Sequence, residues 1–308
     1  MKLAQANHET SLMAHFKIAV GILWLGIHMS NFANPGAVIV LQGTSSSGKS
    51  SISAQLATLL AAQAPETVSI DHFLWSAVIE KAKQLGLITA DMPLAEMQKI
   101  VMTNKAVVFA DFVKTNWLEP KKQCYQAVKN LALAGKLVIL DTVLDEVGNS
   151  QEFAGFYAQM QGVPVFLVLV YCPPVNLAQH VFTRNSLVGY EQKRDIVFVL
   201  KQYCRLYMPT EDAAELDTFT WADLQQCLAT VTQDLQLTGA TDAQLQAALA
   251  DLTKTYQANY HLQAATPVVI TAKRPYDFLV HTGQSSALAC AQLIYAALLT
   301  RKIALKLS

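Results

Sequence analysis

The sequence GTSSSGKS occupies residues 43–50 and decides the fold. It follows the apolar run VIVL at residues 38–41, which is typical of a short buried strand, and it precedes residues 51–62, whose leucine and isoleucine side chains recur at helical spacing. A serine-rich turn can match G-x-x-x-x-G-K-[ST] by chance, but here a strand precedes and a helix follows, as the phosphate-binding motif requires. We therefore predict that this loop binds a nucleoside triphosphate.

Each residue type in the loop has a physical role in binding an anion. Gly43 and Gly48 permit backbone angles that a Cβ atom would forbid, so that successive N–H groups can curve around a phosphate. Lys49 brings positive charge to the β- and γ-phosphates, and the Ser50 hydroxyl can be a Mg²⁺ ligand. The helix that follows adds its N-terminal amides and its dipole. The predicted nucleotide-binding residues are Gly43, Thr44, Ser45, Ser46, Ser47, Gly48, Lys49, Ser50 and Ser51.

Two aspartates follow predicted strands and are candidates for the chemistry. Asp71 comes directly after the strand TVSI at residues 67–70, and ligands of open parallel sheets bind at the carboxyl ends of the strands. It is equally well placed as the N-cap of the next helix, so both interpretations stay open. Asp141 ends the apolar run LVIL at residues 137–140, the position at which P-loop proteins hold Mg²⁺. We therefore predict Ser50 and Asp141 as the metal-binding residues.

The basic residues of the chain concentrate between residues 184 and 205. Phosphoryl transfer needs mobile cations that offset the charge on the migrating group. A lid that carries Arg184 and Arg194 would supply them. The alternative for each of these arginines is a solvated helix face.

Composition limits the classes of partner. Of the 308 residues, 52% are hydrophobic and 15% are charged, which is enough apolar material for a large core. The 23 basic and 23 acidic side chains cancel, so nucleic acid is not an expected partner. The five cysteines show no paired spacing, which favours a reducing compartment over a disulfide framework.

Residues 1–34 form a hydrophobic segment ahead of a domain at residues 35–308. The apolar stretch IAVGILWLGI is followed by small and polar residues, so residues 13–34 have the shape of a secretory signal. The stretch is too short for a comfortable membrane span, and the mature chain is not expected in a membrane. The alternative is an N-terminal helix packed on the domain. Because an ATP-using site needs ATP, we expect a cytoplasmic protein, with export as the other possibility.

Strands and helices alternate along the chain. This order predicts an α/β three-layer sandwich with a mainly parallel sheet, of the P-loop nucleoside triphosphate hydrolase or small-molecule kinase type. Residues 211–266 differ in composition and predict two helices, the first behind a capping box at residues 220–223. We interpret them as a helical insertion. Residues 267–271 and 278–282 are strand-like, and a closing helix follows.

With these segments in order, the chain resembles the chloramphenicol phosphotransferase-like family of P-loop kinases. The resemblance runs over residues 37–210 and 275–297, and it rests on VIVLQGTSSSGKSSI, SIDHF, LVILDTVLDE, VFLVLVYCPP and YDFLVHTGQSSALACAQLI. It implies that Asp71 is the base for a substrate hydroxyl and that Asp141 lies on the Mg²⁺ side of the site. The chain departs from the family pattern at His281, where an acid is usual, and in residues 211–266.

The resemblance implies an ATP- and Mg²⁺-dependent phosphotransferase that acts on a hydroxyl group of a small molecule. Its catalytic residues would be Asp71, Lys49, Arg184 and Arg194. The alternative from another class is a nucleotide-dependent ATPase or switch protein in which residues 211–266 bind a partner. A third possibility is a binding protein that keeps the loop only as a scaffold, against which the complete motif argues.

Overall fold

The computed structural model describes residues 36–104, 107–108, 118–144, 152–187, 195–207, 215–260, 268–271 and 276–301. The hydrophobic segment at residues 1–34 and the predicted lid residue Arg194 lie outside these ranges. Within them, no helix combines the length and the apolar character that crossing a membrane requires.

Five parallel strands form the central sheet, in the order β2-β3-β1-β4-β7. They are β1 (Val38–Gln42), β2 (Glu66–Ser69), β3 (Val138–Thr142), β4 (Val165–Tyr171) and β7 (Phe278–His281). Every residue of β1 and β3 is buried, because these strands are covered on both faces. The predicted parallel α/β sandwich is confirmed.

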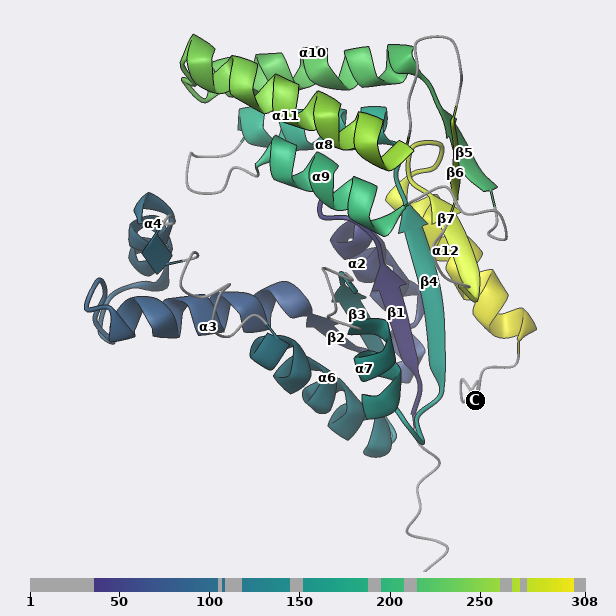
Figure 1. Ribbon diagram of the computed structural model, residues 1–308. Helices are drawn as coiled ribbons and strands as arrows, with labels where there is room; N and C mark the ends of the chain where they lie inside the picture. Colours follow the sequence, from purple (N-terminus) through teal and green to yellow (C-terminus); the bar gives the residue numbers. More distant parts are fainter. Residues whose placement is uncertain are drawn as a thin grey trace, which may run out of the picture.

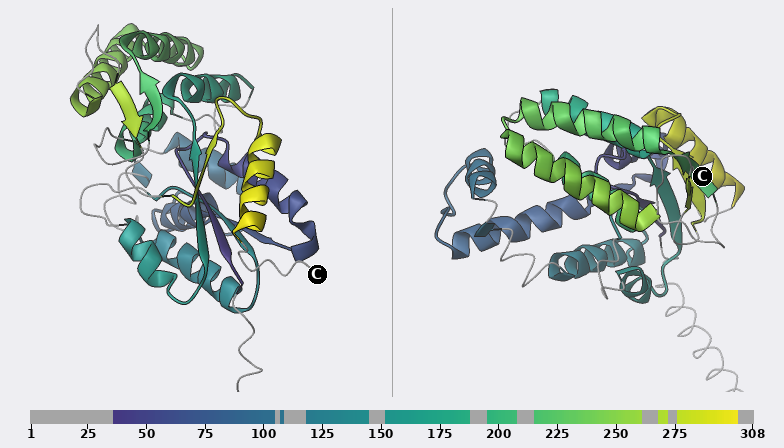
Figure 2. Two further views of the ribbon diagram at one scale, coloured as in Figure 1. Left: turned by 90° about the vertical axis from the view of Figure 1, so that its right-hand side faces the viewer. Right: turned by 45° about the horizontal axis from the view of Figure 1, so that its top comes forward.

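Side chains of β4 alternate between the two faces of the sheet and so show which helices cover each face. Phe166, Val168 and Val170 pack with α2 (Lys49–Leu59) and α12 (Ala287–Thr300) on one side (Figures 1 and 2). Leu167 and Tyr171 point to the other side. That side is covered by α6 (Leu118–Leu133), α7 (Glu152–Gln159), α8 (Pro174–Leu187) and α9 (Ile196–Leu206).

A smaller unit extends from the edge strand β2. The long helix α3 (Ile70–Gln84) packs against α4 (Leu94–Thr103), and Val78, Met97 and Val101 form part of their own apolar cluster. A short 3-10 turn at Ala61–Gln63 joins α2 to β2. Figure 1 shows α3 and α4 projecting away from the sheet, on the side of the carboxyl ends of its strands.

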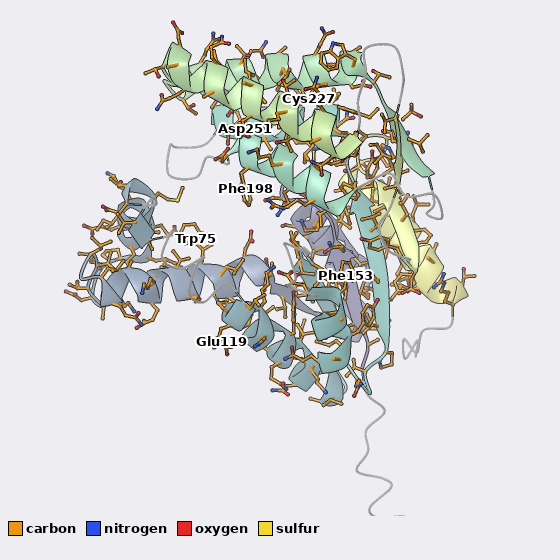
Figure 3. The ribbon with its side chains drawn as sticks, viewed as in Figure 1. Trp75, Glu119, Phe153, Phe198, Cys227 and Asp251 are labelled. Atoms are coloured by element: carbon orange, nitrogen blue, oxygen red, sulfur yellow. The ribbon has the colours of Figure 1, made fainter. Side chains whose placement is uncertain are left out.

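The region predicted as a helical insertion contains the two expected helices, α10 (Trp221–Leu237) and α11 (Asp242–Tyr260). Thr220 and Asp223 form the predicted capping box at the start of α10. Helix α10 packs on α8 and α9, and α11 packs on α9 and α10, around a shared core that includes Cys227, which is labelled in Figure 3. The strand-like run at residues 267–271 becomes β6 (Val268–Thr271), which pairs antiparallel with β5 (Glu215–Phe219) outside the central sheet.

Candidate active site

The phosphate-binding loop joins β1 to α2 at the carboxyl edge of the sheet. Gly48 has φ 95°, a left-handed conformation that glycine adopts without strain. A Cβ atom on Gly43 would lie 2.4 Å from the carbonyl oxygen of Val170, so only glycine lets the loop lie this close to β4. These two positions explain why the motif needs glycine at both ends.

The N-terminus of α2 is open to an anion. The first N–H groups of an α-helix have no partner within the helix. Among the described residues no side chain caps α2, and its first turn contains no acidic residue. The helix dipole and these amides therefore favour a negatively charged ligand at the loop.

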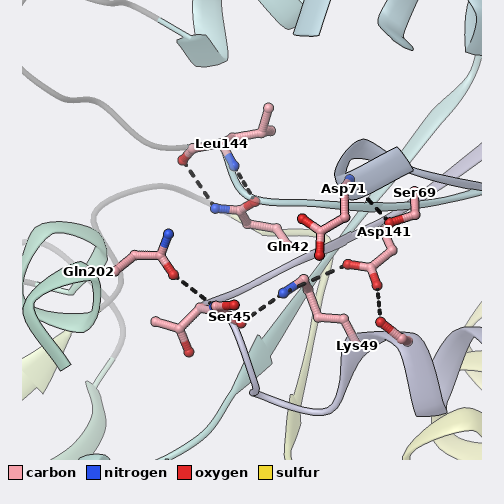
Figure 4. A network of polar contacts seen from close by, with 10 residues as sticks. Gln42, Ser45, Lys49, Ser69, Asp71, Asp141, Leu144 and Gln202 are labelled. Carbon is pink, nitrogen blue, oxygen red and sulfur yellow. Dashed lines mark hydrogen bonds and ion pairs between the residues drawn. The ribbon is translucent and has the colours of Figure 1, made fainter. Parts of the chain in front are cut away.

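Lys49 lies beside Asp141 at the loop (Figure 4), and Ser50 contacts the same carboxylate. The Lys49 ammonium donates to the Thr44 carbonyl oxygen at 2.7 Å and lies 3.7 Å from Asp141 Oδ1. The Ser50 hydroxyl donates to Asp141 Oδ2 at 2.5 Å. The structure thus brings together the predicted phosphate-binding lysine and both predicted metal-binding residues.

Asp71 lies beside this group, at the end of the neighbouring strand. The register of the sheet pairs Ser69 with Asp141, which places Asp71 just beyond the same edge. Figure 4 shows its exposed carboxylate pointing toward the Lys49 ammonium. The alternative interpretation of Asp71 as the helix N-cap is wrong, because Ser69 is the N-cap and its hydroxyl accepts the Asp71 N–H at 3.3 Å.

The structure places Arg184 away from the start of its helix. It lies in the last turn of α8 with an exposed side chain, about 15 Å along the helix axis from the strand end. Arg194 falls outside the described residues. The role of both arginines in a lid therefore stays a prediction.

Two glutamines that the sequence did not single out also contact the site. Gln42, the last residue of β1, accepts the Leu144 N–H at 2.7 Å through its side-chain oxygen and donates to the Leu144 carbonyl oxygen at 3.1 Å through its side-chain nitrogen. Gln202 on α9 accepts the Ser45 N–H at 2.7 Å. No local sequence signal predicts the second contact, because 157 residues separate its two partners.

A polar cavity of about 310 Å³ lies at the ends of β4 and β7. Its lining includes Asn176, Asp217, His281 and Gln284. Thr282, between two lining residues, lies 3.6 Å from the position that a Gly48 Cβ atom would occupy. Burial lowers the pKa of His281, while Asp217 acts in the opposite direction.

Comparison with protein families agrees with the resemblance seen in the sequence. The chain matches the family described as chloramphenicol phosphotransferase-like protein over residues 36–236, which is more than half of its length. The match extends through α10 and so includes part of the region predicted as an insertion. The comparison with curated proteins found no match to this chain.

Solved structures of kinases are among the similar folds. A putative kinase from Chloroflexus aurantiacus aligns with a TM-score of 0.39 and 11% identity, over 87% of this chain and 98% of its own. The APS kinase of Mycobacterium tuberculosis, in complex with AMPPNP and APS, aligns with a TM-score of 0.36 and 13% identity, over 86% and 98%. Shikimate kinase from Acinetobacter baumannii, in complex with shikimate, aligns with a TM-score of 0.33 and 16% identity. The alignment covers 89% of this chain and 98% of the shikimate kinase.

Proposed function

Because this chain belongs to the chloramphenicol phosphotransferase-like protein family and is a P-loop kinase, we propose that it transfers a phosphoryl group from ATP to a hydroxyl group of a small molecule. The convergence of Lys49, Ser50 and Asp141 beneath an uncapped helix N-terminus supports this proposal. Such a site combines fixed amide donors with a buried cation, which is what a triphosphate needs.

Mg²⁺ fits the residues that the site offers. The Ser50 hydroxyl and the Asp141 carboxylate are hard oxygen ligands, and they already lie in contact. Among the described residues no cluster of three or more His, Cys, Asp or Glu side chains forms a metal cage. This agrees with Mg²⁺, which usually keeps several waters and binds one or two protein groups together with phosphates. When bound, Mg²⁺ would offset charge on the phosphate oxygens.

In the proposed mechanism, Lys49 leaves the Thr44 carbonyl and binds the phosphates. Asp71 accepts the proton of the acceptor hydroxyl at the edge of the sheet. Arg184 and Arg194 would close over the moving phosphoryl group from the lid. The cavity beside Thr282 offers room for the nucleoside. The neutral net charge of the chain favours a small acceptor over a nucleic acid.

An ATP-consumption screen tests the proposal. The purified chain, with and without residues 1–34, is assayed against hydroxylated metabolites and antibiotics. We expect consumption of ATP that depends on one acceptor class and is abolished in Lys49→Ala. Asp71→Asn should keep nucleotide affinity and lose turnover, whereas Asp242→Asn, which also changes an exposed first-turn aspartate, should behave as wild type.

Two outcomes would contradict the proposal. Wild-type turnover in Asp71→Asn would remove the assignment of the base. Phosphate release that needs no acceptor would instead identify a nucleotide-dependent ATPase, in which residues 211–266 become the candidate partner-binding module.

A further inference from the structure

The peptide group between Thr44 and Ser45 is held at both ends (Figure 4). Its carbonyl oxygen, on Thr44, accepts from the Lys49 ammonium at 2.7 Å. Its N–H group, on Ser45, donates to Gln202 Oε1, also at 2.7 Å. Two side chains from different helices therefore fix the orientation of one peptide plane in the phosphate-binding loop.

This peptide plane precedes the strained part of the loop. Ser46 follows it with φ 65°, a left-handed conformation that is unfavourable for a residue with a Cβ atom. Ser47 then donates its N–H to the Thr44 carbonyl oxygen at 3.3 Å. Rotation of the 44–45 peptide would break these contacts and turn the amides that follow. Its orientation is thus a condition for the anion-binding shape of the loop.

Gln202 is itself held firmly. Its side chain is only 7% exposed, and its neighbour Tyr203 is fully buried. Helix α9 is anchored to α11 by two tyrosine hydroxyls. Tyr256 donates to the Leu200 carbonyl oxygen at 3.5 Å, and Tyr260 donates to the Tyr207 carbonyl oxygen at 2.6 Å. The acceptor atom that meets Ser45 is therefore presented from a packed helix.

The two contacts on this peptide respond differently to nucleotide. A bound triphosphate draws Lys49 from the Thr44 carbonyl toward its phosphates. Gln202 Oε1 accepts the N–H group at the other end of the same peptide, so the departure of Lys49 does not itself break this bond. In the bound state the peptide plane then keeps two contacts, the 2.7 Å bond to Gln202 and the longer 3.3 Å bond from the Ser47 N–H.

We propose that Gln202 is a positioning residue for phosphoryl transfer, which orients the 44–45 peptide so that the loop keeps its anion-binding shape when Lys49 engages the nucleotide. This inference rests on the proposed function, because it assigns Gln202 to the same site. Gln202 acts through the loop backbone. Loss of the Gln202 amide should therefore weaken nucleotide binding and leave acceptor binding unchanged.

The test replaces Gln202 by methionine, which has a similar length but no amide oxygen. A fluorescent ATP analogue with Mg²⁺ is titrated against the full chain. The KM values for ATP and for the acceptor are then measured at steady state. We expect Gln202→Met to bind the analogue about tenfold more weakly, as for a lost buried hydrogen bond, with an unchanged KM for the acceptor. The control is Lys201→Met, which changes the neighbouring residue of α9, removes its ion pair with Asp251 on α11 and should keep wild-type affinity.

The outcomes separate the inference from the proposed function. A wild-type chain that does not bind the analogue contradicts the proposed function. A wild-type chain that binds it, with Gln202→Met and wild type equal in affinity and in both KM values, overturns the role of Gln202.

Amide hydrogen exchange of the wild type supplies a second measurement that does not depend on a variant. The Ser45 amide should be protected with and without nucleotide, because its bond to Gln202 persists. The Gly48 amide, at the start of α2, should gain protection only with nucleotide. Rapid exchange at Ser45 in both states would also overturn the inference.

Discussion

Replacing Lys121 by methionine tests a buried ion pair that supports the site from below. Lys121 on α6 donates to both carboxylate oxygens of Glu152 on α7, at 2.7 and 2.8 Å. The two side chains are 4% and 3% exposed. The same ammonium lies 3.4 Å from the carbonyl oxygen of Val143, two residues after Asp141. The pair therefore joins two helices to the end of the strand that carries Asp141, the proposed metal-binding aspartate.

The burial of both side chains determines how much unfolding free energy the Lys121→Met variant should lose. Removing one member of a buried pair takes the ion-pair partner away from the other buried charge, which costs about 3–5 kcal/mol of unfolding free energy. For a domain of this size, with an unfolding entropy of about 0.6 kcal/mol/K, that loss lowers the melting temperature by about 5–9 °C. Replacing both members, as Lys121→Met with Glu152→Leu, removes both charges from the interior. We expect the double variant to recover most of the lost stability.

Urea unfolding followed by circular dichroism measures these differences in a double-mutant cycle. Lys122→Met is the matched control, because Lys122 is the next residue on α6 and its side chain is exposed. It should change the unfolding free energy by less than about 0.5 kcal/mol. A Lys121→Met variant as stable as the control would refute the reasoning, and so would a double variant as unstable as the single one.

Two further predictions concern titratable groups in the core and at the cavity. Burial lowers the pKa of His281 below its unfolded value of 6.5. As the pH drops through 6.5, the unfolded chain therefore binds more protons at this residue than the folded chain, and the unfolding free energy should fall. Unfolding free energies measured between about pH 5 and 7 should show a smaller slope in His281→Gln than in wild type, and equal slopes would contradict this assignment. Burial also raises the pKa of the Cys124, Cys172 and Cys204 thiols to about 12, and Cys227 and Cys290 are buried too. A thiol reagent at pH 8 should modify none of the five free cysteines in the native chain and all of them in urea, and rapid native labelling would show that the core opens.

The parts of the site that were predictable are those encoded by neighbouring residues. The loop at residues 43–50 carries its own strand before it and its own helix after it, so the motif and its context lie within one continuous segment. Asp141 was predictable for a related reason. Carboxyl ends of parallel strands share one edge of the sheet, so an acid that ends a buried run must lie near the loop. The capping box at Thr220 is likewise a local pattern.

The features that sequence analysis missed depend on contacts between distant segments. Gln202 reaches Ser45 only because α9 packs over the loop, and nothing near residue 202 in the sequence encodes that packing. The strand β6 looks like any other apolar run, but its partner β5 lies outside the central sheet. The N-cap of α3 is Ser69 and not Asp71, the alternative considered in the sequence. The helix begins at Ile70, two residues earlier than an N-cap at Asp71 would require. Arg184 is exposed, so the concentration of basic residues in the sequence did not by itself show whether their charges face the site.

Charge balance at the loop explains why a magnesium complex is the expected ligand. Lys49 contributes one positive charge, and Asp141 and Asp71 contribute two negative charges, so these three side chains sum to −1. A triphosphate adds several negative charges to the same place, and the helix N-terminus offsets only about half a unit charge. Repulsion between charges a few ångströms apart is severe where water is excluded. The proposed nucleotide binding therefore needs further cations, and in our proposal Mg²⁺ at the Ser50–Asp141 pair and the predicted lid arginines would supply them.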